Sequence, residues 1–301
     1  MTPRLICVGH AALDRVYRIA QFPPEPTKVR AIEHIDSGGG MAANAASAIA
    51  KLGGKSELWS RVGDDAAGQT IRAGLQSLKV DVRWVQSFEG ARSSTSAIIV
   101  DGRGERLIVG DRDTGMPSST AWLPLERVAG AQAVLGDLRW LEGLRAVFAE
   151  ARREGVPTVL DADLGAREAL SDILRLTDYA VFSAPALVDF APDGSTADRL
   201  ARVAALGPKH SGVTSGADGY SWLAADGRLA HIPAFSVDVV DTTGAGDAFH
   251  GAFALGIAEG RPVEEAARMG AACAALKCRR LGSRNGLPTR AELDDLVATR
   301  H

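Results

Sequence analysis

A carboxylate that directly follows three small residues is the part of this sequence best suited to chemistry. The stretch 241–247 reads Asp-Thr-Thr-Gly-Ala-Gly-Asp and leads into an apolar helical pattern. At a helix start, Gly244, Ala245 and Gly246 would let consecutive backbone N–H groups approach an anion such as phosphate, and the helix dipole would add to the attraction. A bound phosphate would repel the Asp247 carboxylate, so a carboxylate at this position suggests a catalytic role. Accepting a proton from an attacking hydroxyl is such a role. On spacing alone, a glycine-rich turn capped by Asp explains the same residues equally well.

Short β-rich segments alternate with longer helical patterns along the chain. The strands are predicted at 5–8, 56–60, 133–136, 158–161 and 179–182. Helical spacing of apolar residues predicts helices at 41–52, 66–79 and 247–258, the second capped by Asp64 or Asp65. This alternation predicts an α/β fold with a mainly parallel sheet sandwiched by helices. Ligands of such sheets bind at the carboxyl ends of the strands.

Two regions, about 12–36 and 88–112, interrupt this alternation and look like strand hairpins. Their strands are expected at 15–19, 28–32, 96–100 and 105–109. We expect them to form a small antiparallel sheet that projects from the main domain as a lid and excludes water when it closes. Such a sheet cannot bury both faces alone. We predict a homodimer through one apolar face, to which the sequence pattern assigns Ile98, Val100, Leu107 and Val109.

Composition restricts the partners. The 301 residues are 46% hydrophobic and 24% charged, with a net charge of −3 and no block of consecutive basic residues. Neither nucleic acid nor an anionic membrane is therefore expected, and the partners should be small molecules. Cys7, Cys273 and Cys278 are scattered, which argues against a disulfide framework or a zinc site. No signal-peptide core and no run of about 20 apolar residues occurs, so we expect one cytoplasmic domain spanning 1–301.

The stretch 241–249 resembles the C-terminal signature of the ribokinase-like (PfkB) carbohydrate kinase family, and the resemblance runs nearly end to end. Residues 38–44, Gly-Gly-Gly-Met-Ala-Ala-Asn, look like the family's other signature, and Asp14 matches an early family Asp. Residues 62–68 and 213–219 fit two further family elements. Five elements in the right order are far more specific than any single one. The resemblance implies a ribokinase-like fold and an ATP-dependent sugar kinase.

The resemblance also implies a role for each matching residue. Asp14 would accept hydrogen bonds from two sugar hydroxyls, and Asn44 would donate and accept. Gly39 and Gly40 would allow close backbone approach to the sugar. Asp247 would be the catalytic base beside the Gly244, Ala245 and Gly246 cradle. The residues implied in ATP binding are Thr214, Gly216, Gly219, Gly244, Gly246, Ala274 and Gly282.

The family resemblance also raises the question of two metal ions, Mg²⁺ and a monovalent cation. The family commonly carries an N-x-x-E motif linked to magnesium, but residues 182–187 read Phe-Ser-Ala-Pro-Ala-Leu. We therefore expect Mg²⁺ to arrive with ATP, because this ion needs few protein ligands and keeps its waters. The family's monovalent-cation site, for K⁺, uses backbone around Asp241, Thr243 and the loop 279–284. Backbone ligands leave no side-chain signal in a sequence.

Within the family, the chain is most similar to bacterial 6-deoxy-6-sulfofructose kinases, through residues 60–65, 104–106, 137–140, 159–161 and 238–241. Those enzymes hold the sulfonate with a lid Lys, an Arg and an Asn. Lys28 and Arg139 match the two cations, whereas Gly110 stands where the Asn is expected. Alternatively, Lys28 is a solvated lid residue and Arg139 pairs with Asp137 or Asp163.

Other functions also fit parts of the pattern. The substrate could be a neutral sugar such as fructose or ribose, a nucleoside, or 2-keto-3-deoxygluconate. The missing N-x-x-E pair also fits a non-catalytic sugar- or nucleotide-sensing kinase homologue, although retention of Asp247 argues against it. A dinucleotide-binding oxidoreductase is excluded, because no G-x-G-x-x-G follows the first strand.

Overall fold

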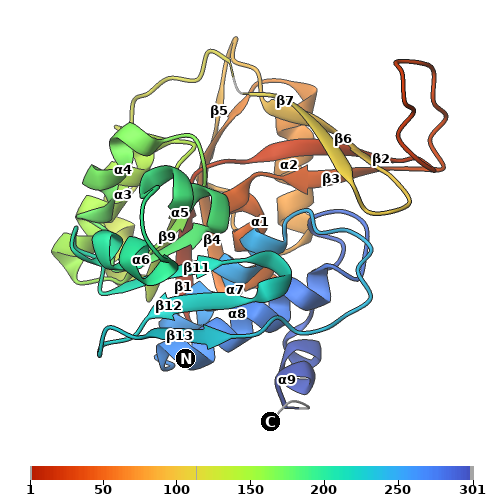
Figure 1. Ribbon diagram of the computed structural model, residues 1–301. Helices are drawn as coiled ribbons and strands as arrows, with labels where there is room; N and C mark the ends of the chain where they lie inside the picture. The colour runs from red at the N-terminus through yellow and green to blue at the C-terminus, as the bar shows by residue number, and fades with distance from the viewer. Residues whose placement is uncertain (1, 113, 299–301) are drawn as a thin grey trace.

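The computed structural model describes residues 2–112 and 114–298 and is built around one large sheet (Figure 1). Nine strands follow the order β13-β12-β11-β10-β9-β8-β1-β4-β5. Their bounds are β1 Arg4–Val8, β4 Lys55–Gly63, β5 Val85–Phe88, β8 Ala133–Asp137, β9 Thr158–Ala162, β10 Tyr179–Ser183, β11 His210–Thr214, β12 Tyr220–Leu223 and β13 Leu229–Ile232. Pairing is parallel from β11 to β5, and β12 and β13 are antiparallel. The predicted parallel sheet and its five predicted strands are therefore confirmed.

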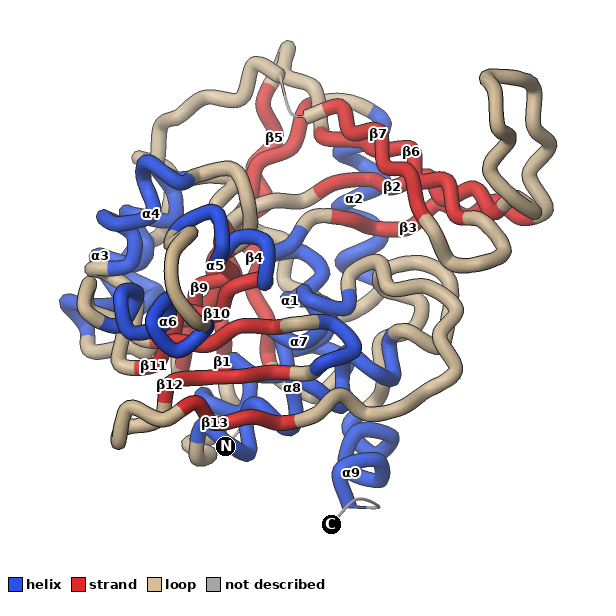
Figure 2. Tube along the Cα trace, viewed as in Figure 1, coloured by secondary structure: helices blue, strands red, loops and turns tan. Residues whose placement is uncertain are grey.

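Helices cover both faces of this sheet (Figure 2). One hydrophobic core contains Leu5 and Cys7 of β1, and the other contains Ile6 and Val8, as the alternation of side chains along a strand requires. The first core packs against α1 Met41–Lys51, α2 Ala66–Ser77, α7 Ala245–Ala258, α8 Val263–Lys277 and α9 Arg290–Ala298. The second packs against α3 Leu141–Glu154, α4 Arg167–Leu174, α5 Ala184–Phe190, α6 Thr196–Ala204 and the 3₁₀ helix Leu125–Gly130. No helix among the described residues is long and apolar enough to cross a bilayer.

A separate sheet of four strands projects beside the carboxyl ends of the large sheet (Figure 1). Its order is β3-β2-β6-β7, with β2 Ala12–Arg18, β3 Glu33–Gly39, β6 Ser94–Val100 and β7 Arg106–Asp111. The expectation of an antiparallel sheet is wrong at its centre, where β2 and β6 run parallel. The strand expected at 28–32 is also wrong. Those residues belong to the loop between β2 and β3, which extends away from the rest of the chain (Figure 1).

The two faces of this small sheet differ from the pattern expected from sequence. Ile98 and Val100 are buried with Val16 and pack against Ile35 and Leu281. Leu107 pairs across the ladder with Ile99, and Val109 pairs with Ala97, so these residues lie on the opposite face from Ile98. The sequence placed Ile98, Val100, Leu107 and Val109 on one face because a hairpin turn of unknown length leaves the register open. The outer apolar face is instead made of Ala97, Ile99, Leu107 and Val109.

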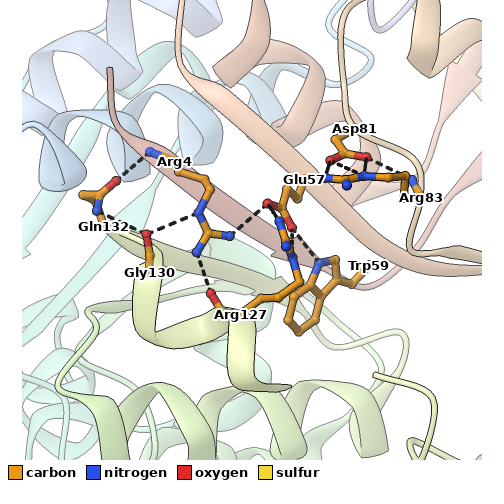
Figure 3. A network of polar contacts seen from close by, with 8 residues as sticks. All are labelled: Arg4, Glu57, Trp59, Asp81, Arg83, Arg127, Gly130 and Gln132. Atoms are coloured by element: carbon orange, nitrogen blue, oxygen red, sulfur yellow. Dashed lines mark hydrogen bonds and ion pairs between the residues drawn. The ribbon is translucent and has the colours of Figure 1, made fainter. Parts of the chain in front are cut away.

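A polar network lies near the amino ends of β1 and β4, at the end of the large sheet away from the small sheet (Figure 3). Glu57 is buried and accepts hydrogen bonds from Arg4 Nη1 at 2.9 Å and Arg127 Nε at 3.1 Å. Although burial alone raises it, the pKa of Glu57 is held below its usual range by these two arginines. Removing one partner would leave an uncompensated buried charge, so loss of Arg4 or Arg127 should destabilise this end of the sheet, remote from the carboxyl ends of the strands.

Candidate active site

The first turn of α7 begins as the sequence predicts for an anion cradle. Gly244 is the N-cap, with φ 77°, in the left-handed region that favours glycine. A side chain on Gly244 would collide with Ser283, whereas one on Gly246 would meet nothing within 4 Å. The backbone around Gly246 therefore faces open space. Below it, His250 is buried and contacts the carbonyl oxygens of Gly246 at 2.7 Å and Val181 at 3.2 Å, which anchors this turn to β10.

Asp247 lies in this first turn and is only partly exposed. The pKa of Asp247 is raised to about 7, mainly by burial and then by the charge of the nearby Asp161. A hydrogen bond from Asn44 Nδ2 to Asp247 Oδ2, 2.7 Å long, and the proximity of His250 oppose that rise. A carboxylate with a pKa near neutrality is matched to accepting and releasing a proton.

Asn44, on α1, is joined to the loop after α8 through Arg284. Arg284 is 5% exposed and donates from Nε to Asn44 Oδ1 at 2.8 Å and from Nη2 to the Gly39 carbonyl at 2.7 Å. The pKa of Arg284 is lowered to about 10 by burial, which the charges of Asp14 and Asp247 offset only in part. The sequence analysis missed Arg284. Its only sequence signal is a charged residue within the glycine-rich stretch 282–286.

Asp14 completes this cluster from β2, on the inner face of the small sheet. Its Oδ1 accepts a hydrogen bond from Ser96 Oγ on β6. Burial raises the pKa of Asp14, while Ser96 and the Arg284 charge lower it, with a net rise. Asp14, Asn44, Gly39 and Asp247 are thus brought together, as the family resemblance implies.

The three consecutive glycines 38–40 each make room for a different neighbour. A Cβ on Gly38 would collide with the Arg284 guanidinium, and one on Gly39 with the Asp14 carboxyl group. Gly40 has φ 89° and passes close to the backbone of His10. Without a Cβ, the backbone here can approach groups that a larger residue would displace.

A neighbouring cavity of about 500 Å³ opens beside the α7 N-terminus. Of the residues expected to bind ATP, it is lined by Thr214, Gly216, Gly219, Gly246 and Ala274, and Ala245 of the expected anion cradle lies beside them. Apolar side chains, including Phe235, Val237 and Phe249, form much of the remaining wall. This mixture is typical of a site for a flat aromatic base joined to an anionic tail.

Two of the residues expected to bind nucleotide lie outside the lining of this cavity. Gly244 backs onto Ser283 instead. Gly282 donates its N–H to Asp241 Oδ2 at 2.8 Å, and a Cβ there would meet Ile35 of the small sheet. Gly282 therefore joins the loop after α8 to the loop that precedes α7 rather than forming the cavity wall.

The two cations expected to hold an anionic substrate are placed differently. Arg139 Nη1 donates to the Leu164 carbonyl at 2.9 Å, and Nη2 lies 3.5 Å from Asp163 Oδ2. Lys28 is exposed on the loop between β2 and β3, which extends away from the large sheet (Figure 1). Gly110 lies on the inner face beside Ser96, and a Cβ there would meet nothing within 4 Å.

Among the described residues, no group of three or more His, Cys, Asp or Glu could hold a metal ion. At the position of the missing N-x-x-E motif, Ser183 caps α5 and donates to Asp163 Oδ1 at 2.9 Å. Mg²⁺ would be held mainly by ATP phosphates and water.

Comparison with known proteins identifies the class to which this site belongs. The model of the pfkB family carbohydrate kinases matches residues 2–290, and the chain belongs to this family. It is 29% identical over 302 residues to the ribokinase of Bacillus subtilis (strain 168), covering 98% of this chain and 100% of that protein. The chain is therefore a carbohydrate kinase, a phosphotransferase with an alcohol group as acceptor.

Solved structures give the same class. A candidate ribokinase from Agrobacterium tumefaciens is 37% identical, with a TM-score of 0.95 over 99% of this chain and 98% of that one. Arabidopsis thaliana ribokinase, solved with ribose and ATP, is 26% identical, with a TM-score of 0.86 over 99% of each chain. The predicted ribokinase-like fold is confirmed. These relatives are named ribokinases, so they do not support the narrower resemblance to sulfofructose kinases.

Proposed function

We propose that this kinase transfers the γ-phosphoryl group of ATP to a primary hydroxyl of a fructose-like ketose, with Asp247 as general base. The observation that carries this proposal is the position of Asp247. It is hydrogen-bonded to Asn44 within the polar cluster, and it directly follows Gly246, which lines the 500 Å³ cavity. A hydroxyl bound among Asp14, Asn44 and Gly39 would meet a phosphate at the α7 N-terminus with a carboxylate beside both.

Each group has a defined part in this reaction. Asp14 and Asn44 bind sugar hydroxyls and orient the acceptor. Asp247 takes the proton as the hydroxyl oxygen attacks phosphorus. The N–H groups of residues 244–246 and the helix dipole stabilise the charge on the transferring phosphoryl group. Mg²⁺ bound to ATP would neutralise part of the phosphate charge.

A substrate with an anionic terminus, of which 6-deoxy-6-sulfofructose is the first to test, depends on Arg139. Its ion pair with Asp163 is long, at 3.5 Å, and its side chain is 21% exposed. A sulfonate could accept two N–H groups from such a guanidinium. Lys28 does not support an anionic substrate, because its loop projects away from the site.

A substrate panel tests both parts of the proposal. ADP release would be measured with Mg²⁺, K⁺ and sulfofructose, fructose, fructose phosphates, ribose, nucleosides or 2-keto-3-deoxygluconate. We expect turnover of sulfofructose, and Arg139→Ala should raise its apparent KM by about one to two orders of magnitude. Arg167, an exposed arginine paired with Asp189, provides the control variant Arg167→Ala.

Other results would change the proposal in distinct ways. Preference for a neutral sugar, unaffected by Arg139→Ala, would refute the anionic substrate and leave the kinase standing. Sugar binding without turnover of any compound in the panel would instead favour the non-catalytic sensor.

A further inference from the structure

Lys277, the last residue of α8, has a side chain that is completely buried. Its Nζ donates a 2.7 Å hydrogen bond to the main-chain oxygen of Asp241 and lies 3.7 Å from Asp241 Oδ2. Burying an ammonium is costly unless acceptors and an opposite charge compensate it. Asp241 supplies both, so the position of this cation is defined by Asp241.

Asp241 is the residue at which two functional loops meet. Its Oδ1 accepts the Thr243 N–H at 2.9 Å within residues 241–246, the proposed phosphate-binding loop. Its Oδ2 accepts the Gly282 N–H at 2.8 Å from the loop that carries Arg284. The Lys277 ammonium therefore neutralises the carboxylate that holds the phosphate-binding loop and the Arg284 loop together.

This arrangement does not fit the K⁺ ion expected near Asp241 and Thr243. Hard cations such as K⁺ are bound by oxygen ligands, and the Asp241 main-chain oxygen that accepts from Lys277 belongs to the backbone expected to bind such an ion. A second cation beside Nζ would be repelled, since like charges a few ångströms apart in a buried site interact strongly. The site already contains one positive charge, provided by the chain itself.

We propose that Lys277 replaces the monovalent cation, so that this kinase holds its phosphate-binding loop without K⁺. The ammonium carries the same single charge as K⁺ but is covalently attached and cannot dissociate. It also places positive charge beneath the loop that receives the ATP phosphates. This inference rests on the proposed kinase function, which K⁺ independence refines.

The groups around Lys277 favour its charged form, because Asp241 contributes both an accepting carbonyl oxygen and a nearby carboxylate. Burial lowers the pKa of Lys277, and the charge and side-chain hydrogen bond of Asp241, with the charges of Cys278 and Asp247, offset part of that fall. The only sequence signal for this role is a lysine that follows the apolar residues 274–276.

The test compares cations at equal ionic strength in two variants of different size. Turnover and the Tm of the complex with a non-hydrolysable ATP analogue would be measured in KCl, NH₄Cl, methylammonium chloride and choline chloride. The wild type should give the same turnover and Tm in KCl and choline chloride. Lys277→Ala leaves a space for a small cation, so it should lose about 100-fold or more in choline chloride and recover substantially with K⁺, NH₄⁺ or methylammonium.

Two controls separate charge from packing. Lys277→Met fills the same volume without charge and should lose turnover that no cation restores. Lys209, which pairs with Asp178 on the surface and is 78% exposed, gives the control Lys209→Met, with no cation dependence expected.

Either of two results would overturn the proposal. One is a wild-type enzyme that K⁺ activates more than about tenfold over choline, the opposite of a built-in charge. The other is a Lys277→Ala variant with normal turnover in choline chloride. If both Lys277 variants fail to fold, the comparison of wild-type turnover and Tm in KCl and choline chloride still tests whether the enzyme needs K⁺. A K⁺-specific rise in wild-type Tm would refute the proposal even before any substrate is found, whereas absence of turnover with every sugar counts against the kinase function instead.

Discussion

Asn44 donates a 2.7 Å hydrogen bond from Nδ2 to Asp247 Oδ2, linking α1 to the first turn of α7. The other end of the amide, Oδ1, accepts from Arg284 Nε. Because Arg284 has only donors, it fixes the amide so that its NH₂ group faces Asp247. The proposed base is therefore held in place before a substrate arrives.

Replacing Asp247 with Asn should abolish most turnover. The amide keeps the size of the side chain but cannot accept the proton, so kcat should fall about 10²–10⁴-fold while ATP binding changes little. Steady-state ADP release and ATP titration measure the two effects. Asp226→Asn, in an exposed turn and paired with Arg228, is the control. Near-normal kcat in Asp247→Asn would remove Asp247 from the role of base.

Activity should depend on pH through Asp247. Its pKa is raised to about 7, mainly by burial, and only the deprotonated carboxylate can act as base. We therefore expect kcat/KM to rise with pH through about 7 and to decline tenfold per pH unit well below it. A pH profile of kcat/KM at saturating ATP measures this acid limb, the decline below about pH 7. A profile that stays flat down to about pH 5 would mean that Asp247 titrates at its ordinary value.

Loss of the Arg284 charge should affect both sugar binding and this pH limb. Arg284→Met removes the donors to Asn44 and Gly39, so we expect a rise of roughly 10- to 100-fold in the KM for sugar. It also removes a cation near Asp247, which should move the acid limb of kcat/KM to higher pH. Arg280→Met, an exposed neighbour in the same loop, is the control.

Gly38→Ala tests the same contact from the other side. Its methyl group would displace the Arg284 guanidinium, so this variant should impair sugar binding in the wild type but have little further effect in Arg284→Met. Additive effects of the two substitutions, or an unmoved acid limb in Arg284→Met, would show that Arg284 serves packing alone.

The outer face of the small sheet should pair two copies of the chain. Leu107 is 50% exposed and Val109 60% exposed, on an edge strand with apolar neighbours Ile99 and Ala97. Light scattering should give twice the 31.5 kDa mass of one chain. Val109→Asp should yield the monomer, and Leu229→Asp, on the edge strand β13, should not. A monomeric wild type in dilute solution would contradict this prediction.

Sequence patterns predicted the fold well where local signals and burial agree. The strand at 133–136 and the helix at 66–79 were found because their apolar periodicity reflects burial, and the structure selects Asp65 as the N-cap through its hydrogen bond from Gly68. The small sheet was found as well, but not the parallel pairing of β2 with β6. That pairing joins segments distant in sequence, and no local residue pattern specifies it.

The candidate site was predictable to the extent that it lies in family motifs. Asp14, Asn44 and Asp247 stand in such motifs and were found. Arg284 and Lys277 owe their importance to partners far away in sequence, Asn44 and Asp241 respectively. A single charged residue in a loop or at a helix end gives no spacing to interpret. Their roles became visible only when burial and hydrogen-bond partners were known.

The loop that carries Arg284 has a consequence for how the enzyme is made. The guanidinium that orients Asn44 is contributed by Arg284, 240 residues later in the chain. Synthesis proceeds from the N-terminus, and contacts of such large sequence separation are slow to form. The nascent chain can therefore assemble much of its large sheet while its sugar site is still incomplete, so the site cannot be completed before residue 284 has been synthesised.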